Sequence, residues 1–137
     1  MHLILSAQDI RSITFGVFDG EGVHSVTEVA SSPEGYFPAL DVFLSEQSLP
    51  LKNLEGVIVV TGPGSFTASR VSTTIANSIA FTQSIPVVGL ENPERLDLPT
   101  LLQGKLFEGV DYVIPSYDRP PLITKSKPKM GINSVTE

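Results

Sequence analysis

The segment from Val57 to Leu90 constrains the fold more than any other part of the chain. It begins with the continuous apolar run Val57–Val60, which is typical of a strand buried on both faces of a sheet. A Gly-Pro-Gly turn at 62–64 follows, and the polar residues after it can cap a helix that we expect over Thr67–Gln83. Pro86–Leu90 then predicts another short strand. This order indicates two parallel strands joined by a helical crossover.

Three strands and a helix are expected before this segment. The strands are predicted at Leu3–Leu5, Ser12–Phe18 and Val23–Val29, with turn residues at 19–22 between the last two. Apolar residues at helical spacing predict a helix over about Phe37–Gln47. The fold class is therefore α/β, with a mixed sheet that combines an antiparallel meander with helical crossovers. This is the pattern of a single actin-like (ASKHA, ribonuclease H-like) lobe.

We expect residues 1–118 to form this lobe, with its core in 1–92. The pattern leaves 93–118 open, with a short helix or a linker over Leu96–Leu106 and a last strand at Val110–Ile114. Residues 119–137 are rich in proline and lysine and are expected to form a mobile tail.

The charge balance argues against autonomous binding to nucleic acid. The net charge is −6, and four of the nine Lys and Arg residues fall within Arg119–Lys129. A protein that holds phosphates by itself is expected to carry a basic face. The longest purely apolar run is too short to cross a bilayer, and the first ten residues lack a signal-peptide pattern. We therefore expect a cytoplasmic protein.

The turn and its surroundings carry a family pattern. Gly62–Thr67 reads GPGSFT, Arg70 follows, and Ile85–Gly89 reads IPVVG. This pattern resembles the TsaB (YeaZ-like) family, the B subunit of the bacterial tRNA threonylcarbamoyladenosine synthase and a paralogue of its catalytic D subunit. The resemblance covers residues 1–92, and residues 115–121 resemble the closing PxYxRPP motif of the family.

The chain departs from the active members of the actin-like superfamily at the end of its first strand. Where those members carry Asp-Thr-Ser, this chain has Ala7-Gln8-Asp9, and alanine cannot hold the metal and phosphates of ATP. The first predicted helix lacks the metal-binding histidines of the catalytic paralogue. Between Asn92 and the PxYxRPP-like motif at 115–121, we count too few residues for another full lobe. We therefore expect no catalytic residue, no cofactor and no metal site.

Two chemical interpretations of the turn compete with a structural one. The Gly62–Ser65 amides could bind a phosphate, but the Gly-Lys-Ser/Thr ending of a P-loop is missing. Ser65 could be a nucleophile, but such a serine needs a positioned base, and the two histidines, His2 and His24, lie on or near the predicted amino-terminal strands. A tight strand-to-helix turn explains the same residues more simply.

The helix predicted over Thr67–Gln83 has two different faces. At 100° per residue, one stripe carries the larger apolar residues and is expected to pack on the sheet: Val71, Ile75, Ser78, Ile79 and Thr82. Another side carries only small, uncharged residues: Ser69, Ser72, Thr73, Ala76 and Ala80. Small side chains let a second helix approach closely. We therefore predict that this side binds a partner helix, unless the chain's own first helix or tail covers it.

The family resemblance implies that the first two helices pair with another subunit. The residues predicted to bind this partner are Phe37, Leu40, Leu44, Phe66, Ser69, Arg70, Ser72, Thr73, Ala76 and Ala80. The implied partner is the catalytic TsaD-like paralogue in a heterodimer, with the TsaE-like ATPase subunit as a further partner. A homodimer through the same helices is an alternative.

The implied function is that of a non-catalytic scaffold subunit. It would support the paralogue that transfers the threonylcarbamoyl group to adenosine 37 of tRNA. The alternative is a minimal actin-like ATPase or phosphotransferase that uses Asp9.

Overall fold

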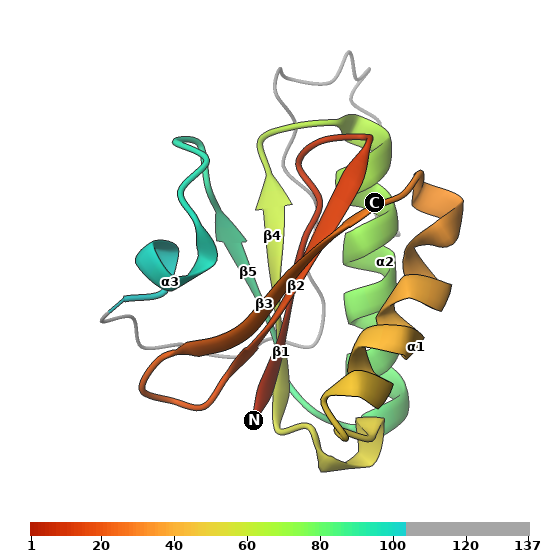
Figure 1. Cartoon of the computed structure of the whole chain (residues 1–137), viewed down its shortest axis with the longest axis vertical. Helices are drawn as coiled ribbons and strands as arrows, with labels where there is room; N and C mark the ends of the chain where they lie inside the picture. The colour runs from red at the N-terminus through yellow and green to blue at the C-terminus, as the bar shows by residue number, and fades with distance from the viewer. Residues whose placement is uncertain (104–137) are drawn as a thin grey trace, which may run out of the picture.

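The computed structural model describes residues 1–103 (Figure 1). The expected strand at 110–114, the closing motif at 115–121 and the expected tail lie outside the described residues. The strands are β1 (His2–Ser6), β2 (Ser12–Phe18), β3 (Val23–Ala30), β4 (Gly56–Gly62) and β5 (Val87–Glu91). The helices are α1 (Tyr36–Glu46), α2 (Phe66–Gln83) and α3 (Leu98–Leu101), with short 3₁₀ turns η1 (Pro33–Gly35) and η2 (Leu51–Asn53).

The five strands form one mixed sheet in the order β3-β2-β1-β4-β5. Strands β1, β2 and β3 pair antiparallel, whereas β1 pairs with β4 and β4 with β5 in parallel. Helices α1 and α2 lie side by side on one face of the sheet, and α3 lies on the other (Figure 1). The predicted α/β class, with a meander and helical crossovers, is confirmed.

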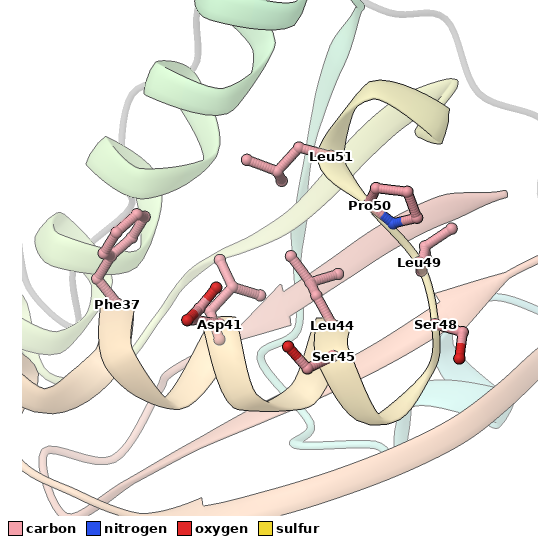
Figure 2. A pocket seen from close by; sticks show the side chains of 9 residues that line it. Phe37, Asp41, Leu44, Ser45, Ser48, Leu49, Pro50 and Leu51 are labelled. Atoms are coloured by element: carbon pink, nitrogen blue, oxygen red, sulfur yellow. The ribbon is translucent and has the colours of Figure 1, made fainter.

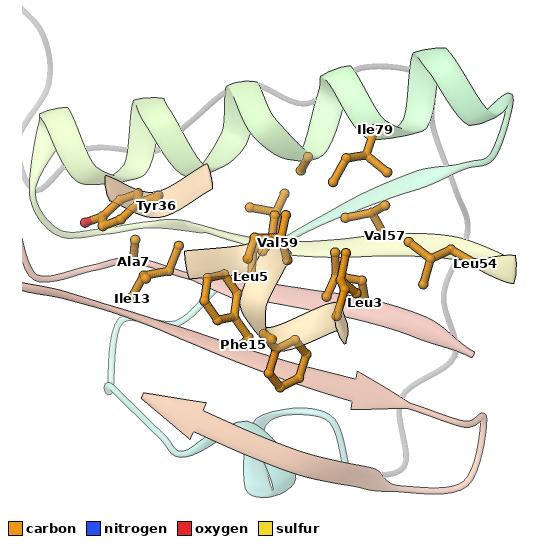
Figure 3. Close-up of a cluster of buried hydrophobic side chains, with 14 of the residues drawn as sticks. Leu3, Leu5, Ala7, Ile13, Phe15, Tyr36, Leu54, Val57, Val59 and Ile79 are labelled. Atoms are coloured by element: carbon orange, nitrogen blue, oxygen red, sulfur yellow. The ribbon is translucent and has the colours of Figure 1, made fainter. Parts of the chain in front are cut away.

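The main hydrophobic core lies between the sheet and helices α1 and α2 (Figure 3). Side chains alternate along β1, so that Leu3 and Leu5 enter this core while Ile4 enters a second cluster on the opposite face. Helix α1 is fixed to β2 by the stacked rings of Phe15 and Phe43, whose centroids are 5.4 Å apart. The second cluster is covered by α3. Strand β4 is buried at every position, because each of its two faces is covered by one of these clusters, as its apolar run predicts.

Helix α2 packs on the sheet through its small residues. Ser69, Ser72, Thr73, Ala76 and Ala80 are all buried, together with Ala68 and Ile79. Ser78 and Thr82 are exposed, and Val71 and Ile75 are half-buried at the margin of the core. Of the stripe that was predicted to face the sheet, only Ile79 is buried, so the predicted orientation of this helix was wrong. The observed orientation has a steric cause. The aliphatic side chains of β1 and β4 already fill the core, so the helix needs small side chains in order to approach the sheet.

One hydroxyl in this contact has no hydrogen-bond partner. Thr73 Oγ1 is buried and unpaired, although the side chain lies in an otherwise close-packed layer. A buried hydroxyl without a partner costs stability, because it loses its bonds to water.

Replacing Thr73 by valine should therefore stabilise the protein. We expect Thr73→Val to raise the free energy of unfolding by about 1 kcal/mol, because the shape is kept and the unpaired hydroxyl is removed. Urea denaturation of the full chain measures this. The matched control is Thr74→Val, since Thr74 is exposed and its hydroxyl donates to the Arg70 carbonyl at 2.8 Å. The control should not gain stability, and a clear loss of stability in Thr73→Val would contradict the prediction.

The histidine at the start of β1 gives the fold a pH dependence. His2 packs edge-on to Phe18, with ring centroids 6.1 Å apart, and its Nδ1 is buried without a partner. Burial, and then the N-terminal ammonium, lower the pKa of His2 below its ordinary value of 6.5. The unfolded chain therefore binds this proton more tightly than the folded chain does.

It follows that the stability contributed by neutral His2 is present above about pH 6.5 and is lost as the pH falls through the lower folded pKa. The test compares the unfolding free energies of the wild type and of His2→Leu between pH 7.5 and pH 5, a range that spans the ordinary histidine pKa. The wild type should lose stability relative to the variant as the pH falls. Since both proteins retain His24, parallel curves would show that His2 contributes nothing.

Candidate partner-binding surface

The outward face of α2 carries aromatic residues and almost no charge. Phe66 is 49% exposed and Phe81 is 84% exposed. They share one side of the helix with Arg70 and Thr74, because separations of four, eight and fifteen residues return to nearly the same direction at 100° per residue. Arg70, whose guanidinium carbon lies 5.8 Å from the centroid of the Phe66 ring, is the sole charged residue of this 18-residue helix.

Helix α1 adds a third exposed aromatic side chain and an apolar groove. Phe37 is 59% exposed on the first turn of α1. Beyond it, a groove of about 380 Å³ runs between α1 and the segment that leads into η2. Figure 2 shows Asp41 and Leu44 rising from α1 toward Leu51 on the opposite wall. The groove is lined by Phe37, Leu40, Asp41, Leu44, Ser45 and residues 48–51.

The two helices present one continuous layer to the outside. Both contribute to the core cluster on the same face of the sheet, so their remaining sides point away from it together. The outward side of this layer, defined here as Phe37, Phe66, Arg70, Phe81 and the α1 groove, is called the helical face below.

The structure separates the ten residues predicted to bind a partner into three groups. Phe37, Phe66 and Arg70 lie at the surface, on the helical face. Leu40 and Leu44 are buried but line the groove. The five small residues, Ser69, Ser72, Thr73, Ala76 and Ala80, are buried within the chain's own fold, so the prediction that this side is open to a partner helix was wrong.

Sequence reasoning missed Phe81. The residue lies outside the stripe that was expected to face the sheet, and its helical position matches that of Phe66 and Arg70. A single aromatic residue late in a helix of small residues was the available signal.

The turn at 62–65 is held by contacts within the chain itself. Gly62 has a φ of +134°, and a Cβ on Gly64 would lie 2.5 Å from the Gln8 carbonyl oxygen. The Ser65 amide donates to that same oxygen at 2.8 Å, and the Ser65 hydroxyl accepts from the Ala68 amide at 3.1 Å. The interpretation as a tight turn that caps α2 is confirmed, because its glycines and its serine have structural tasks.

Asp9, the residue considered for nucleotide chemistry, is bound to its neighbour. Its two carboxylate oxygens accept from Arg11 Nε at 3.0 Å and Nη2 at 2.9 Å, and Oδ1 also accepts from the Arg11 amide. These bonds hold the pKa of Asp9 far below its usual range. Within residues 1–103, no group of His, Cys, Asp and Glu side chains is placed to hold a metal ion.

Within residues 1–103, no helix combines the length and the hydropathy that a membrane span requires.

Comparison with known proteins places the sequence in one family. The model of the family described as "TsaD: tRNA N6-adenosine threonylcarbamoyltransferase" matches residues 29–105, more than half of the chain. The chain is 28% identical over 81 residues to the tRNA threonylcarbamoyladenosine biosynthesis protein TsaB of Bacillus subtilis, covering 59% of the chain and 33% of the relative. It is 38% identical over 71 residues to the tRNA N6-adenosine threonylcarbamoyltransferase of Geobacter metallireducens, covering 50% of the chain and 21% of the relative.

A solved structure supports the fold. YeaZ from Pseudomonas aeruginosa superimposes with a TM-score of 0.58 at 17% identity, over 66% of this chain and 43% of that one. The chain thus spans about a third of the curated TsaB protein and less than half of the solved YeaZ chain. The chain belongs to the family of the tRNA N6-adenosine threonylcarbamoyltransferase TsaD, and over about 60% of its length it is a TsaB/YeaZ-like protein.

Proposed function

We propose that the chain is a non-catalytic scaffold subunit that binds a catalytic TsaD-like paralogue through the helical face. In this role it supports the synthesis of threonylcarbamoyladenosine at position 37 of tRNA. The names of its relatives support a place in tRNA threonylcarbamoyladenosine synthesis. Because the chain spans only part of those relatives, the partner and the activity belong to the proposal.

The observation that carries the proposal is the composition of the exposed side of α2. A solvated helix face normally carries several charged residues, whereas this one carries Arg70 alone. Aromatic residues and arginine are enriched in the cores of protein interfaces, where other charges are depleted. Phe66 and Phe81, on either side of Arg70, fit that composition.

The groove on α1 supplies the concave part of the same surface. Its floor is apolar, with Leu40 and Leu44 largely buried at its base. An apolar side chain from a partner helix would be desolvated there, which is the arrangement in which single residues contribute most to binding. Among the residues that line the groove, Asp41 is the charged one, so a basic residue at the rim of the partner would be favoured.

The residues that follow the carboxyl end of β1 support a role without catalysis. Ala7 is buried and has no polar side chain, and the Asp9 carboxylate is already occupied by Arg11. This pair is exposed, so it competes only weakly with a metal ion. The main obstacle to an ATPase site is Ala7, whose side chain offers no ligand.

Replacing Phe81 by lysine tests the proposed face. We expect Phe81→Lys to weaken binding to the TsaD-like protein of the same organism at least about tenfold, since it places a charge in the apolar part of the interface. Because Phe81 is 84% exposed, unfolding should change by less than about 0.5 kcal/mol. Calorimetric titration of the full chain with the partner measures the affinity.

The control is Val26→Lys, which makes a similar change at a 46% exposed position on the edge strand β3. Unchanged affinity in Phe81→Lys, or equal loss in both variants, would show that α2 is not the binding surface. A chain that forms a stable homodimer by light scattering and ignores the partner would favour self-association through the same helices.

A second experiment addresses catalysis. Titration of the isolated chain with magnesium-ATP should give no binding heat, because Asp9 is engaged by Arg11 and Ala7 offers no ligand. The same titration with Arg11→Ala separates a blocked site from an absent one. Saturable binding by the wild type would contradict the scaffold role and favour the ATPase alternative.

A further inference from the structure

Gln8, the second residue after β1, joins three segments that are far apart in the sequence. Its side-chain nitrogen Nε2 donates to the Pro63 carbonyl at 2.7 Å and to the Asn92 carbonyl at 2.8 Å. Pro63 belongs to the turn between β4 and α2, and Asn92 follows β5. One amide group therefore ties the carboxyl ends of three parallel strands together.

The backbone of Gln8 holds the same turn from the other side. Its carbonyl oxygen accepts from the Ser65 amide at 2.8 Å, and its Cα and carbonyl lie so close to Gly64 that no side chain fits there. The turn is thus fixed at Pro63, Gly64 and Ser65, the three residues immediately before the first turn of α2.

Asn92 completes the arrangement on the β5 side. Its backbone amide donates to the Gly62 carbonyl at 2.7 Å. Its side-chain nitrogen donates to the Leu96 carbonyl, and its side-chain oxygen accepts from the Leu96 amide, both at 2.9 Å. Asn92 is 2% exposed, so its position is set by these bonds and not by solvent. The Asn92 carbonyl that accepts from the Gln8 side chain is therefore held in place by bonds that do not involve Gln8.

We propose that Gln8 is a positioning residue for the partner-binding surface: it fixes the start of α2 and thereby the direction in which Phe66 and Arg70 point. This inference rests on the proposed function only for the identity of the partner. The helix begins at Phe66, one residue after Ser65, whose amide donates to the backbone carbonyl of Gln8. Arg70 lies one turn farther on. A small displacement of the turn therefore moves both side chains.

The chemistry of the site requires a donor at this position. Two carbonyl oxygens within 2.8 Å of one atom accept well from an amide nitrogen and repel a carboxylate oxygen. A glutamate here would hold its proton more tightly than usual and would lose the bond when it ionised. The charged groups that line the same groove as Gln8 are Asp9, Glu28, Arg95 and Asp97.

The test is Gln8→Glu in the full chain, with Gln103→Glu as the matched control. Gln103 is exposed and lies after α3, so the control adds the same charge away from the turn. The protection of the Ser65 amide against hydrogen exchange, normalised for pH, reports the turn, and titration with the TsaD-like partner reports the binding surface. Both are measured between pH 5 and pH 8, a range chosen to span a raised glutamate pKa.

We expect Gln8→Glu to lose Ser65 protection at least about tenfold at the alkaline end and to recover much of it at the acidic end, where the carboxyl is protonated. Partner affinity should follow the same pH trend, whereas the control and the wild type should not show it. Gln8→Met, which keeps the length and removes the donor, should lose protection at every pH. Should Gln8→Glu unfold at the alkaline end only, its refolding on acidification supports the same conclusion.

Undiminished Ser65 protection in Gln8→Met, or in Gln8→Glu at the alkaline end, would overturn the inference. So would lost protection accompanied by unchanged partner affinity, because the turn would then be fixed by Gln8 without consequence for binding. If the wild type does not bind the partner at all, the proposed function fails and the positioning role falls with it, while the exchange data still decide whether Gln8 fixes the start of α2.

Discussion

The close contact between α2 and strands β1 and β4 determines what the rest of the surface can be. Aliphatic residues of the sheet, such as Leu5 and Val59, fill the core together with Ile79 of the helix (Figure 3). The other buried residues of α2 are small: serine, threonine and alanine. Interiors are packed to nearly crystalline density, so the size of the side chains on one layer dictates the size on the other. With its small residues used against the sheet, α2 turns its phenylalanines outward. Solvent exposure of Phe66 and Phe81 is thus a consequence of the core.

The same contact explains which parts of the fold could be predicted from the sequence. The apolar run of β4, the meander and both long helices follow from local periodicity, and their bounds lie within a residue or two of the expected ones. The facing of α2 does not follow in this way. The prediction assumed that the larger residues Val71 and Ile75 must face the core, but the sheet already supplies the bulk there, and these two residues lie at its margin.

The candidate site was predicted only in part, because its residues depend on which side of α2 faces the sheet. The small, uncharged side of α2 was recognised from the sequence, but its composition did not reveal that this side is buried within the chain's own fold. Phe37, Phe66 and Arg70 were chosen and lie on the helical face, whereas Phe81 was missed. The role of Gln8 was beyond sequence reasoning, since its hydrogen bonds reach residues 55 and 84 positions away and depend on the strand order.

Open α/β sheets commonly bind ligands at the carboxyl edge of their parallel strands. Here the hydrogen bonds that Gln8 and Asn92 make at this edge hold the turn before α2 in place. We propose that the helical face is the surface that meets the TsaD-like partner. Hydrogen–deuterium exchange of the full chain, alone and with that partner, tests this most directly. We expect added protection in 36–46 and 66–83 with β3 unchanged, and protection confined to the strand edges would contradict this role.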